Sequence, residues 1–142
     1  MSYLLDTNIV SEAFRPHRNV EVEVWFARTP RSRIFVSSVT KAELLFGLAI
    51  MSAGRRRLEL SEAMFKFLSY ELKTEVLPFG TREAEFFAEI GSHRRANGRP
   101  ISQFDTQIAA IARSHGFAVV TRNVGDFEHC GIEVINPWEA TT

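Results

Sequence analysis

The chain has 142 residues, of which 45% are hydrophobic and 24% charged, and its 17 basic and 17 acidic residues give a formal net charge of zero. This length and composition fit one globular domain over residues 1–142, and the charge balance argues against a protein that grips nucleic acid by bulk positive charge. The single cysteine, Cys130, excludes an internal disulfide and fits a reducing cytoplasm, and no apolar run approaches the roughly 18 residues of a membrane span.

The pattern of apolar residues predicts strands that alternate with helices. In chain order we expect a strand at 3–5, a helix at 20–27, a strand at 33–37, helices at 40–51 and 58–72, a strand at 75–79, helices at 81–96 and 104–115, and strands at 118–121 and 132–135. Thr7 or Asn8 can cap a helix after the first strand. Gly116 ends the helix at 104–115, at a position where helices favour glycine.

This alternation predicts an α/β fold with a parallel sheet covered by helices on both faces. In such sheets, ligands bind beyond the carboxyl ends of the strands. Asp6 and Asp126 both follow predicted strands, and Glu43 lies near the start of the helix after the second strand, so we expect these acids at that edge. Asp105 begins a helix that leads into a strand, and this rule does not place it.

Each of the four acids also fits a purely structural role. Glu43 follows Thr40 at the spacing of a capping box, and Asp105 in a first helical turn complements the helix dipole. Asp6 can cap a helix, and Asp126 can be a turn residue. Because all four lie at element boundaries that the topology gathers on one edge, we favour a shared site.

A cluster of carboxylates predicts a divalent cation. Two carboxylates about 4–5 Å apart repel by roughly 3–4 kcal/mol at an effective dielectric of about 20, so a cluster either takes up protons or binds a cation. Oxygen ligands alone favour Mg²⁺ or Mn²⁺, whereas zinc favours Cys or His. The four histidines show no metal-ligand spacing.

Fourteen of the seventeen basic residues are arginines, whose planar fork suits phosphates and carboxylates. They cluster at 55–57 and at Arg94, Arg95 and Arg99. We take Arg94, Arg95 and Arg99 as candidates for contact with a phosphate backbone. Solvated helix ends and contact with an acidic partner segment remain open alternatives, and the sequence assigns no role to the cluster at 55–57.

Four motifs occur in order: Leu4-Leu5-Asp6-Thr7-Asn8, Thr40-x-x-Glu43-Leu44, Asp105-x-x-Ile108-Ala109-Ala110-x-Ala112 and Thr121-Arg122-Asn123-x-x-Asp126-Phe127. Together they resemble the PIN-domain family of small ribonucleases, specifically the VapC-type toxins of bacterial toxin–antitoxin pairs. The ending Asn136-Pro137-Trp138 resembles the branch that includes the FitB regulator. The resemblance covers essentially the whole chain.

The resemblance implies a three-layer α/β/α sandwich with a five-stranded parallel sheet. It also implies one or two Mg²⁺ or Mn²⁺ ions that activate water to hydrolyse an RNA phosphodiester. Asp6 and Asp105 match the usual metal ligands, and Glu43 completes the first three. The fourth acid varies in position in the family; here Asn123 fills one option and Asp126 the other, so we assign Asp126 to a second ion.

Further roles follow from the same resemblance. Thr7, Asn8, Thr121 and Asn123 are expected to hydrogen-bond around the metal ligands and fix their geometry. The family also implies a cytoplasmic homodimer and a cognate antitoxin whose C-terminal segment lies across the active-site groove. Contact with DNA is expected only through that antitoxin, and contact with membrane is not expected.

Two rival functions differ in chemistry. A binding module that pairs with a DNA-binding antitoxin and acts through operator occupancy is compatible with the FitB-like ending, and metal-dependent RNA cleavage separates it from a nuclease. A phosphatase with Asp6 as nucleophile requires an acid two residues later, where this chain has Asn8.

Overall fold

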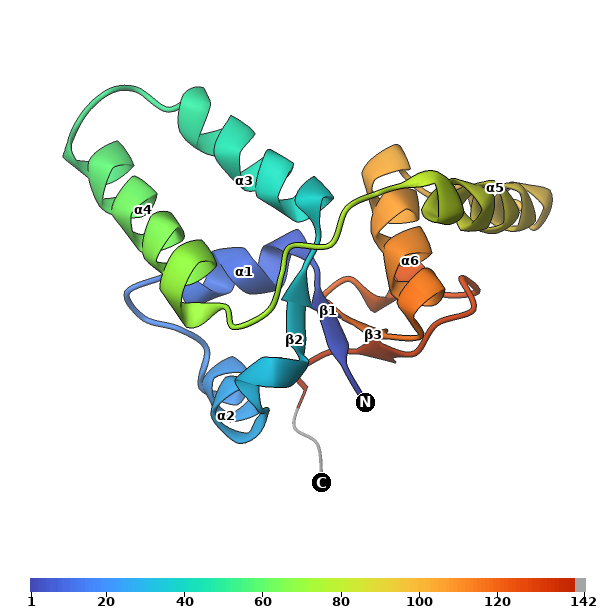
Figure 1. Ribbon diagram of the computed structural model, residues 1–142, viewed down its shortest axis with the longest axis horizontal. Coiled ribbons are helices and arrows are strands. Elements are labelled where there is room, and N and C mark those ends of the chain that lie inside the picture. Colours follow the sequence, from blue (N-terminus) through green and yellow to red (C-terminus); the bar gives the residue numbers. More distant parts are fainter. Residues whose placement is uncertain (140–142) are drawn as a thin grey trace.

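The structure is a computed structural model that describes residues 1–139, so the last three residues of the expected 1–142 domain lie outside the described range (Figure 1). Its sheet consists of strands β1 (Tyr3–Leu5), β2 (Ile34–Val36), β3 (Ala118–Val120) and β4 (Val134–Ile135). All neighbours are parallel, in the order β2-β1-β3-β4. Leu5 lies between Val36 and Val120 across the two central pairs. The parallel α/β sheet predicted from the sequence is confirmed.

The described residues form a sheet of four strands, so the expected count of five was wrong. The segment 75–79, predicted as a strand, forms only an isolated parallel bridge between Ser37 and Leu77. Leu77 donates its N–H to Val36 O at 2.9 Å, and its own carbonyl accepts from Ser38 N–H at 2.8 Å. Both backbone groups of Leu77 face β2, so the backbone nitrogen of Pro78 points to the open edge of the sheet, where proline is tolerated, and the bridge is not repeated at the neighbouring residues.

The helices lie close to the predicted positions. They are α1 (Thr7–Ala13), α2 (Val20–Arg28), α3 (Ser38–Ala49), α4 (Arg55–Lys66), α5 (Thr81–Ala96) and α6 (Gln103–His115), with single turns at Arg31–Arg33 and Val124–Phe127. The predicted helix at 58–72 begins earlier, at Arg55, and ends in a π-helical turn, Phe67–Glu71. Asp6, rather than Thr7 or Asn8, caps α1. No helix within residues 1–139 has the length and apolarity to span a bilayer.

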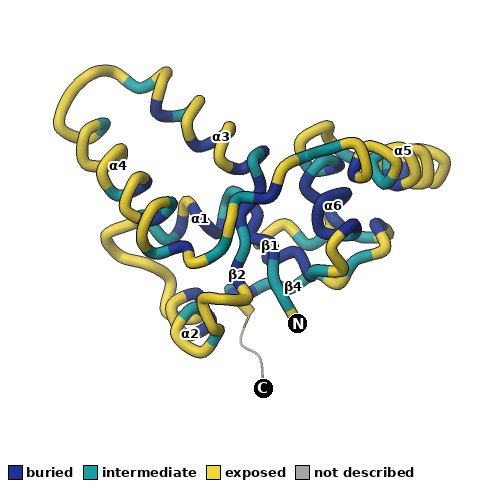
Figure 2. Tube along the Cα trace, viewed as in Figure 1, coloured by how far each residue is buried: buried dark blue, intermediate teal, exposed yellow. Residues whose placement is uncertain are grey.

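Alternate side chains of the strands face two separate cores. Leu4 and Val119 pack with Ile108 of α6 on one face of the sheet. Leu5 packs with Leu44 of α3 and with side chains of α1 and α4 on the other. Helices α5 and α6 cover the first face and α1, α3 and α4 the second, with the buried residues concentrated in the strands and in α6 (Figures 1 and 2). This is the expected three-layer α/β/α arrangement.

Candidate active site

A polar pocket of about 410 Å³ opens beyond the carboxyl ends of β1 and β3. Its lining includes three of the four predicted acids and three of their predicted polar neighbours, namely Asp6, Glu43, Asp105, Thr7, Asn8 and Asn123. Asp105 arrives there because α6 immediately precedes β3 and runs back antiparallel to it. The start of α6 therefore lies at the edge where β3 ends, which explains a placement that the strand rule alone did not give.

Asp6 accepts hydrogen bonds both from its own motif after β1 and from the motif after β3. Its Oδ1 accepts from Thr7 N–H at 2.8 Å, and its Oδ2 accepts from the Thr121 hydroxyl at 2.8 Å and from Asn8 Nδ2 at 3.1 Å. The Asn123 N–H donates in turn to Thr121 Oγ1 at 3.0 Å. Asp6 is only 6% exposed, so these donors fix the orientation of its carboxylate.

Glu43 is joined to the same network through Thr7. The Thr7 hydroxyl donates to Glu43 Oε1 at 2.8 Å and lies 3.1 Å from the Thr40 hydroxyl. The capping-box alternative for Glu43 was wrong, because α3 is capped by Ser37, which accepts from Thr40 N–H at 3.1 Å. Glu43 therefore lies inside the helix, with its carboxylate in the pocket.

The carboxylates interact electrostatically as one group. The pKa of Asp6 is raised to about 6, chiefly by burial and in smaller part by the charges of Asp105 and Glu43, against the opposing effect of the hydrogen bonds from Thr121 and Thr7. The pKa of Asp105 is also raised, chiefly by burial, with contributions from Asp126 and Glu43. Asp126 lies on the exposed turn after β3, outside the pocket lining, and acts on Asp105 through its charge.

The donor set fits a hard divalent cation in its chemistry, since it offers the mutually repelling carboxylate oxygens of buried Asp6 and half-buried Glu43 and Asp105. Among residues 1–139, however, no three acidic, His or Cys side chains stand close enough together to enclose an ion in their present positions. The tight cluster expected from the sequence is thus not formed. Glu43, Asp105 and Asp126 would have to draw toward Asp6 when an ion binds.

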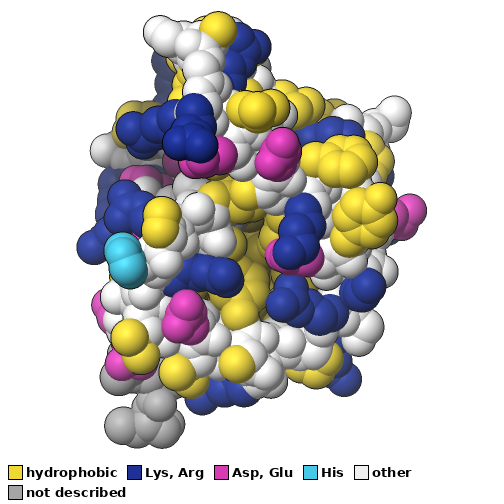
Figure 3. Space-filling view, turned by 90° about the vertical axis from the view of Figure 1, so that its left-hand side faces the viewer, with side chains coloured by type: hydrophobic (Ala, Val, Ile, Leu, Met, Phe, Trp, Pro, Cys, Tyr) yellow, Lys and Arg dark blue, Asp and Glu magenta, His cyan; other side chains and the backbone are white. Residues whose placement is uncertain are grey.

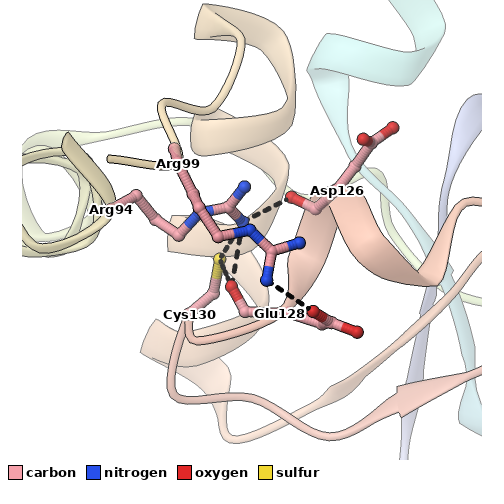
Figure 4. A network of polar contacts seen from close by, with 5 residues as sticks. All are labelled: Arg94, Arg99, Asp126, Glu128 and Cys130. Carbon is pink, nitrogen blue, oxygen red and sulfur yellow. Dashed lines mark hydrogen bonds and ion pairs between the residues drawn. The ribbon is translucent and has the colours of Figure 1, made fainter. Parts of the chain in front are cut away.

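The prediction that Arg94 contacts a phosphate backbone was wrong. Arg94 is 4% exposed, and its guanidinium is occupied by main-chain carbonyls, among them Asp126 O at 2.9 Å (Figure 4). Arg95 is exposed but lines a separate groove between α5 and α6, and Arg99 pairs with Glu128 at 3.0 Å. None of the three lines the acidic pocket.

The cations that do line the acidic pocket are Arg15 and Arg122, which the sequence reasoning missed. Arg122 is exposed, and its guanidinium lies 5.2 Å from the ring centroid of Trp138, which also lines the pocket. Arg15 makes a 3.8 Å ion pair with Glu12. Arg122 belongs to the motif that follows β3, so its position next to Asn123 could have identified it as a pocket residue. Arg15 follows α1, a helix whose bounds were not predicted, so the sequence offered no comparable indication.

A second, apolar groove of about 530 Å³ adjoins the acidic pocket between α1, α3 and α4. Leu48, Met51 and Met64 contribute apolar walls, and Arg56 and Glu59 lie on the lining as well. On this face of the molecule a hydrophobic hollow is surrounded by basic and acidic side chains (Figure 3). Thr7, Ser11, Arg15 and Glu43 line both spaces, so the groove leads directly to the acids.

Comparison with known proteins gives consistent matches over nearly the whole chain. The family model for the PIN domain matches residues 3–131. The chain is 40% identical to the plasmid stability protein StbB of Pseudomonas syringae pv. tomato, over 96% of this chain and 99% of that protein. It is 36% identical to VapC ribonuclease Y4jK of Sinorhizobium fredii, over 96% and 97%. A chain in the solved structure of FitAB bound to a DNA fragment superposes with a TM-score of 0.91 and 33% identity, covering 99% of this chain and 98% of that one.

Proposed function

The chain belongs to the PIN-domain family, and from this premise we propose that it is a metal-dependent endoribonuclease, the toxin of a toxin–antitoxin pair. The observation that carries the proposal is the convergence of Asp6, Glu43 and Asp105 on one pocket beyond the carboxyl ends of the central strands. The similarity to a VapC ribonuclease over nearly its full length supports the same activity.

We assign separate tasks to the acids. Asp6 and Asp105 would hold the principal ion, Glu43 would hold it or orient the attacking water, and Asp126 would assist at a second ion. Mg²⁺ or Mn²⁺, when bound there, would lower the pKa of water and neutralise charge that develops on the phosphate. Thr7, Asn8 and Thr121 would keep Asp6 in a fixed orientation, as their hydrogen bonds already do.

The RNA backbone is best placed along Arg15 and Arg122, because both line the acidic pocket. A phosphate that approaches carboxylates needs nearby cations, and the guanidinium fork suits phosphate oxygens. Arg122 stacked on Trp138 offers a cation beside an aromatic surface. Arg95 and Arg99 lie outside the pocket and are secondary candidates for more distant backbone contacts.

The cognate antitoxin is the proposed protein partner, and we place a segment of it in the apolar groove between α1, α3 and α4. An apolar face laid in this groove would reach the acids without interruption, because both spaces share Thr7 and Glu43. We further propose that the protein acts in the cytoplasm as a homodimer and contacts DNA only through the antitoxin.

Operator binding by such a toxin–antitoxin complex is a second candidate function, favoured by the match to a FitAB structure that contains DNA. The two functions are compatible, since RNA cleavage would use the acidic pocket and operator binding would use the antitoxin. If the protein supports operator binding and cleaves no RNA, operator binding would be its sole remaining function.

The test is incubation of labelled RNA with Mg²⁺ or Mn²⁺ and the wild-type, Asp6→Asn and Asp105→Asn proteins. We expect metal-dependent cleavage by wild type and a loss of at least about a hundredfold in each variant, because each removes one charged ligand. Sequencing of RNA ends after brief expression, with Asp6→Asn as the control, would identify the substrate. Cleavage by both variants at the wild-type rate would remove these residues from the mechanism.

A further inference from the structure

Arg94 is a buried cation that binds main-chain carbonyls in place of a carboxylate. Its Nε donates to Arg99 O at 2.7 Å, and its Nη1 donates to Asp126 O and Glu128 O, both at 2.9 Å (Figure 4). Within the described part of the chain, no ion pair involves Arg94. A surface role for this arginine is thus excluded, and its burial needs another reason.

The burial of an arginine is costly unless the charge is well compensated. Here three charge-assisted hydrogen bonds compensate it, and they use the fork of the guanidinium to join two separate segments. One segment is the turn after α5 that contains Arg99, and the other is the turn after β3 that contains Asp126. A side chain needed only for packing at this place would not have to carry a charge.

The two carbonyls bound by Nη1 flank a core residue. Phe127, between Asp126 and Glu128, is 1% exposed and packs in the core beneath α5 and α6. Its ring and the two carbonyls together fix the turn that carries Asp126. In Figure 4 the main-chain oxygen of Asp126 faces Arg94 while its carboxylate points the other way. The ion pair between Arg99 and Glu128 closes the outer side of the same turn.

We propose that Arg94 is the positioning residue of the fourth acid: by binding the carbonyls of Asp126 and Glu128, it fixes the turn from which the Asp126 carboxylate, which lies outside the present pocket lining, can reach a bound ion. The inference rests on the proposed function, since it assumes that the acids of this pocket hold a divalent cation. Positioning by Arg94 and a simple charge effect predict opposite changes in cation affinity when Arg94 is replaced. Removal of a nearby positive charge alone would tighten cation binding, whereas loss of positioning would weaken it.

The test is a double-mutant cycle on Mn²⁺ binding, measured by calorimetry on the full chain without RNA. We expect Arg94→Met and Asp126→Asn each to weaken Mn²⁺ binding on the order of tenfold, and the double variant to be no weaker than either one. Arg82→Met, an exposed position on the same helix, should leave the affinity unchanged. Unchanged or tighter binding by Arg94→Met, or single effects that multiply in the double variant, would overturn the inference.

Two further measurements keep the outcome decisive. If Arg94→Met does not fold, as judged by its circular dichroism and melting curve, the same cycle is run with Arg94→Lys, which keeps the charge but loses the fork. Unchanged or tighter Mn²⁺ binding by Arg94→Lys, or single effects that multiply in the double variant, would overturn the inference. RNA cleavage is assayed separately. If the wild-type protein binds Mn²⁺ and the cycle is non-additive but no RNA is cleaved, the nuclease proposal fails and the role of Arg94 is retained. If RNA is cleaved but the cycle is additive, the nuclease proposal is retained and the role of Arg94 fails.

Discussion

Thr121 donates its hydroxyl hydrogen to Oδ2 of Asp6 across 2.8 Å, although the two residues lie 115 positions apart in the sequence. The contact follows from strand register. Leu5 of β1 pairs with Val120 of β3, so the residues that follow each strand arrive side by side at the carboxyl edge. Both side chains are buried, and the hydrogen bond therefore joins the motif after β1 to the motif after β3.

Replacement of Thr121 by valine should weaken Mn²⁺ binding on the order of tenfold, because Asp6 loses a donor that orients its carboxylate. The free energy of unfolding should fall by about 1 kcal/mol, the usual net contribution of one such hydrogen bond. Calorimetric titration and urea unfolding measure the two effects. Thr121→Ser keeps the hydroxyl and should retain the wild-type affinity; a valine variant that binds Mn²⁺ as well as wild type would contradict the orienting role.

The metal-free protein should lose stability as the pH rises from about 4 to about 6. Burial raises the pKa of Asp6 from its ordinary value of 3.8 to about 6, so in this window the folded state keeps a proton that the unfolded state has released. This contribution, about 3 kcal/mol, is fully present below pH 3.8 and disappears as the pH rises through about 6. The raised pKa of Asp105 acts in the same direction.

Urea unfolding in EDTA at several pH values would measure this dependence, with Asp6→Asn as the comparison. Subtraction of the variant from wild type removes the effect of the carboxylates that do not interact with Asp6 and leaves the titration of Asp6 together with its coupling to Asp105 and Glu43. We expect the difference to change by a few kcal/mol across the window. A difference that stays flat with pH would show that Asp6 does not keep its proton in the folded state.

The sequence was enough to place Asp6 at the carboxyl edge of the sheet, because a motif at the end of a strand needs little tertiary information. Asp6 follows an apolar run directly, and parallel strands must end at one edge. The α/β class and most helices could likewise be predicted from the periodicity of apolar residues, which is also a local property of the sequence. Asp105 was recognised by its motif, but its convergence on the pocket depends on the return direction of α6, which no local pattern encodes.

Arg94 and the missing strand show what local patterns cannot supply. Arg94 and Arg95 are adjacent and chemically identical, yet one is buried under the turn of Asp126 and the other is exposed, because only the packing of α5 distinguishes the two faces. The segment around Leu77 has the composition of a strand, but it meets β2 only at the bridge between Ser37 and Leu77, and how long a segment stays beside its neighbour is decided by the rest of the fold. Both errors arise from tertiary context.

Arg122 should contribute more to RNA binding than Arg95 does. Arg122 lines the acidic pocket, whereas Arg95 lines a groove without acids. With RNA binding measured in EDTA, so that no cleavage occurs, Arg122→Gln should lower the slope of log K against log salt by about 0.7 for each phosphate that the guanidinium neutralised. Arg95→Gln is the matched comparison. A change of slope in Arg95→Gln alone would return the RNA path to the sequence-based candidates.

If the protein forms the proposed homodimer, its interface should include the exposed side of α3. Phe46 and Ile50 are 66% and 69% exposed and lie four residues apart, so they share one face at the end of the helix, beside half-exposed Leu45. Exposed apolar side chains grouped in this way mark an interaction surface.

We expect Phe46→Glu to convert the dimer to a monomer in light-scattering measurements, since a dimer interface does not accept an unpaired buried charge. Phe65→Glu, at a similarly exposed phenylalanine of α4, should remain dimeric. Dissociation by Phe65→Glu and not by Phe46→Glu would move the interface to α4, and a monomeric wild-type protein would remove the dimer from the proposal.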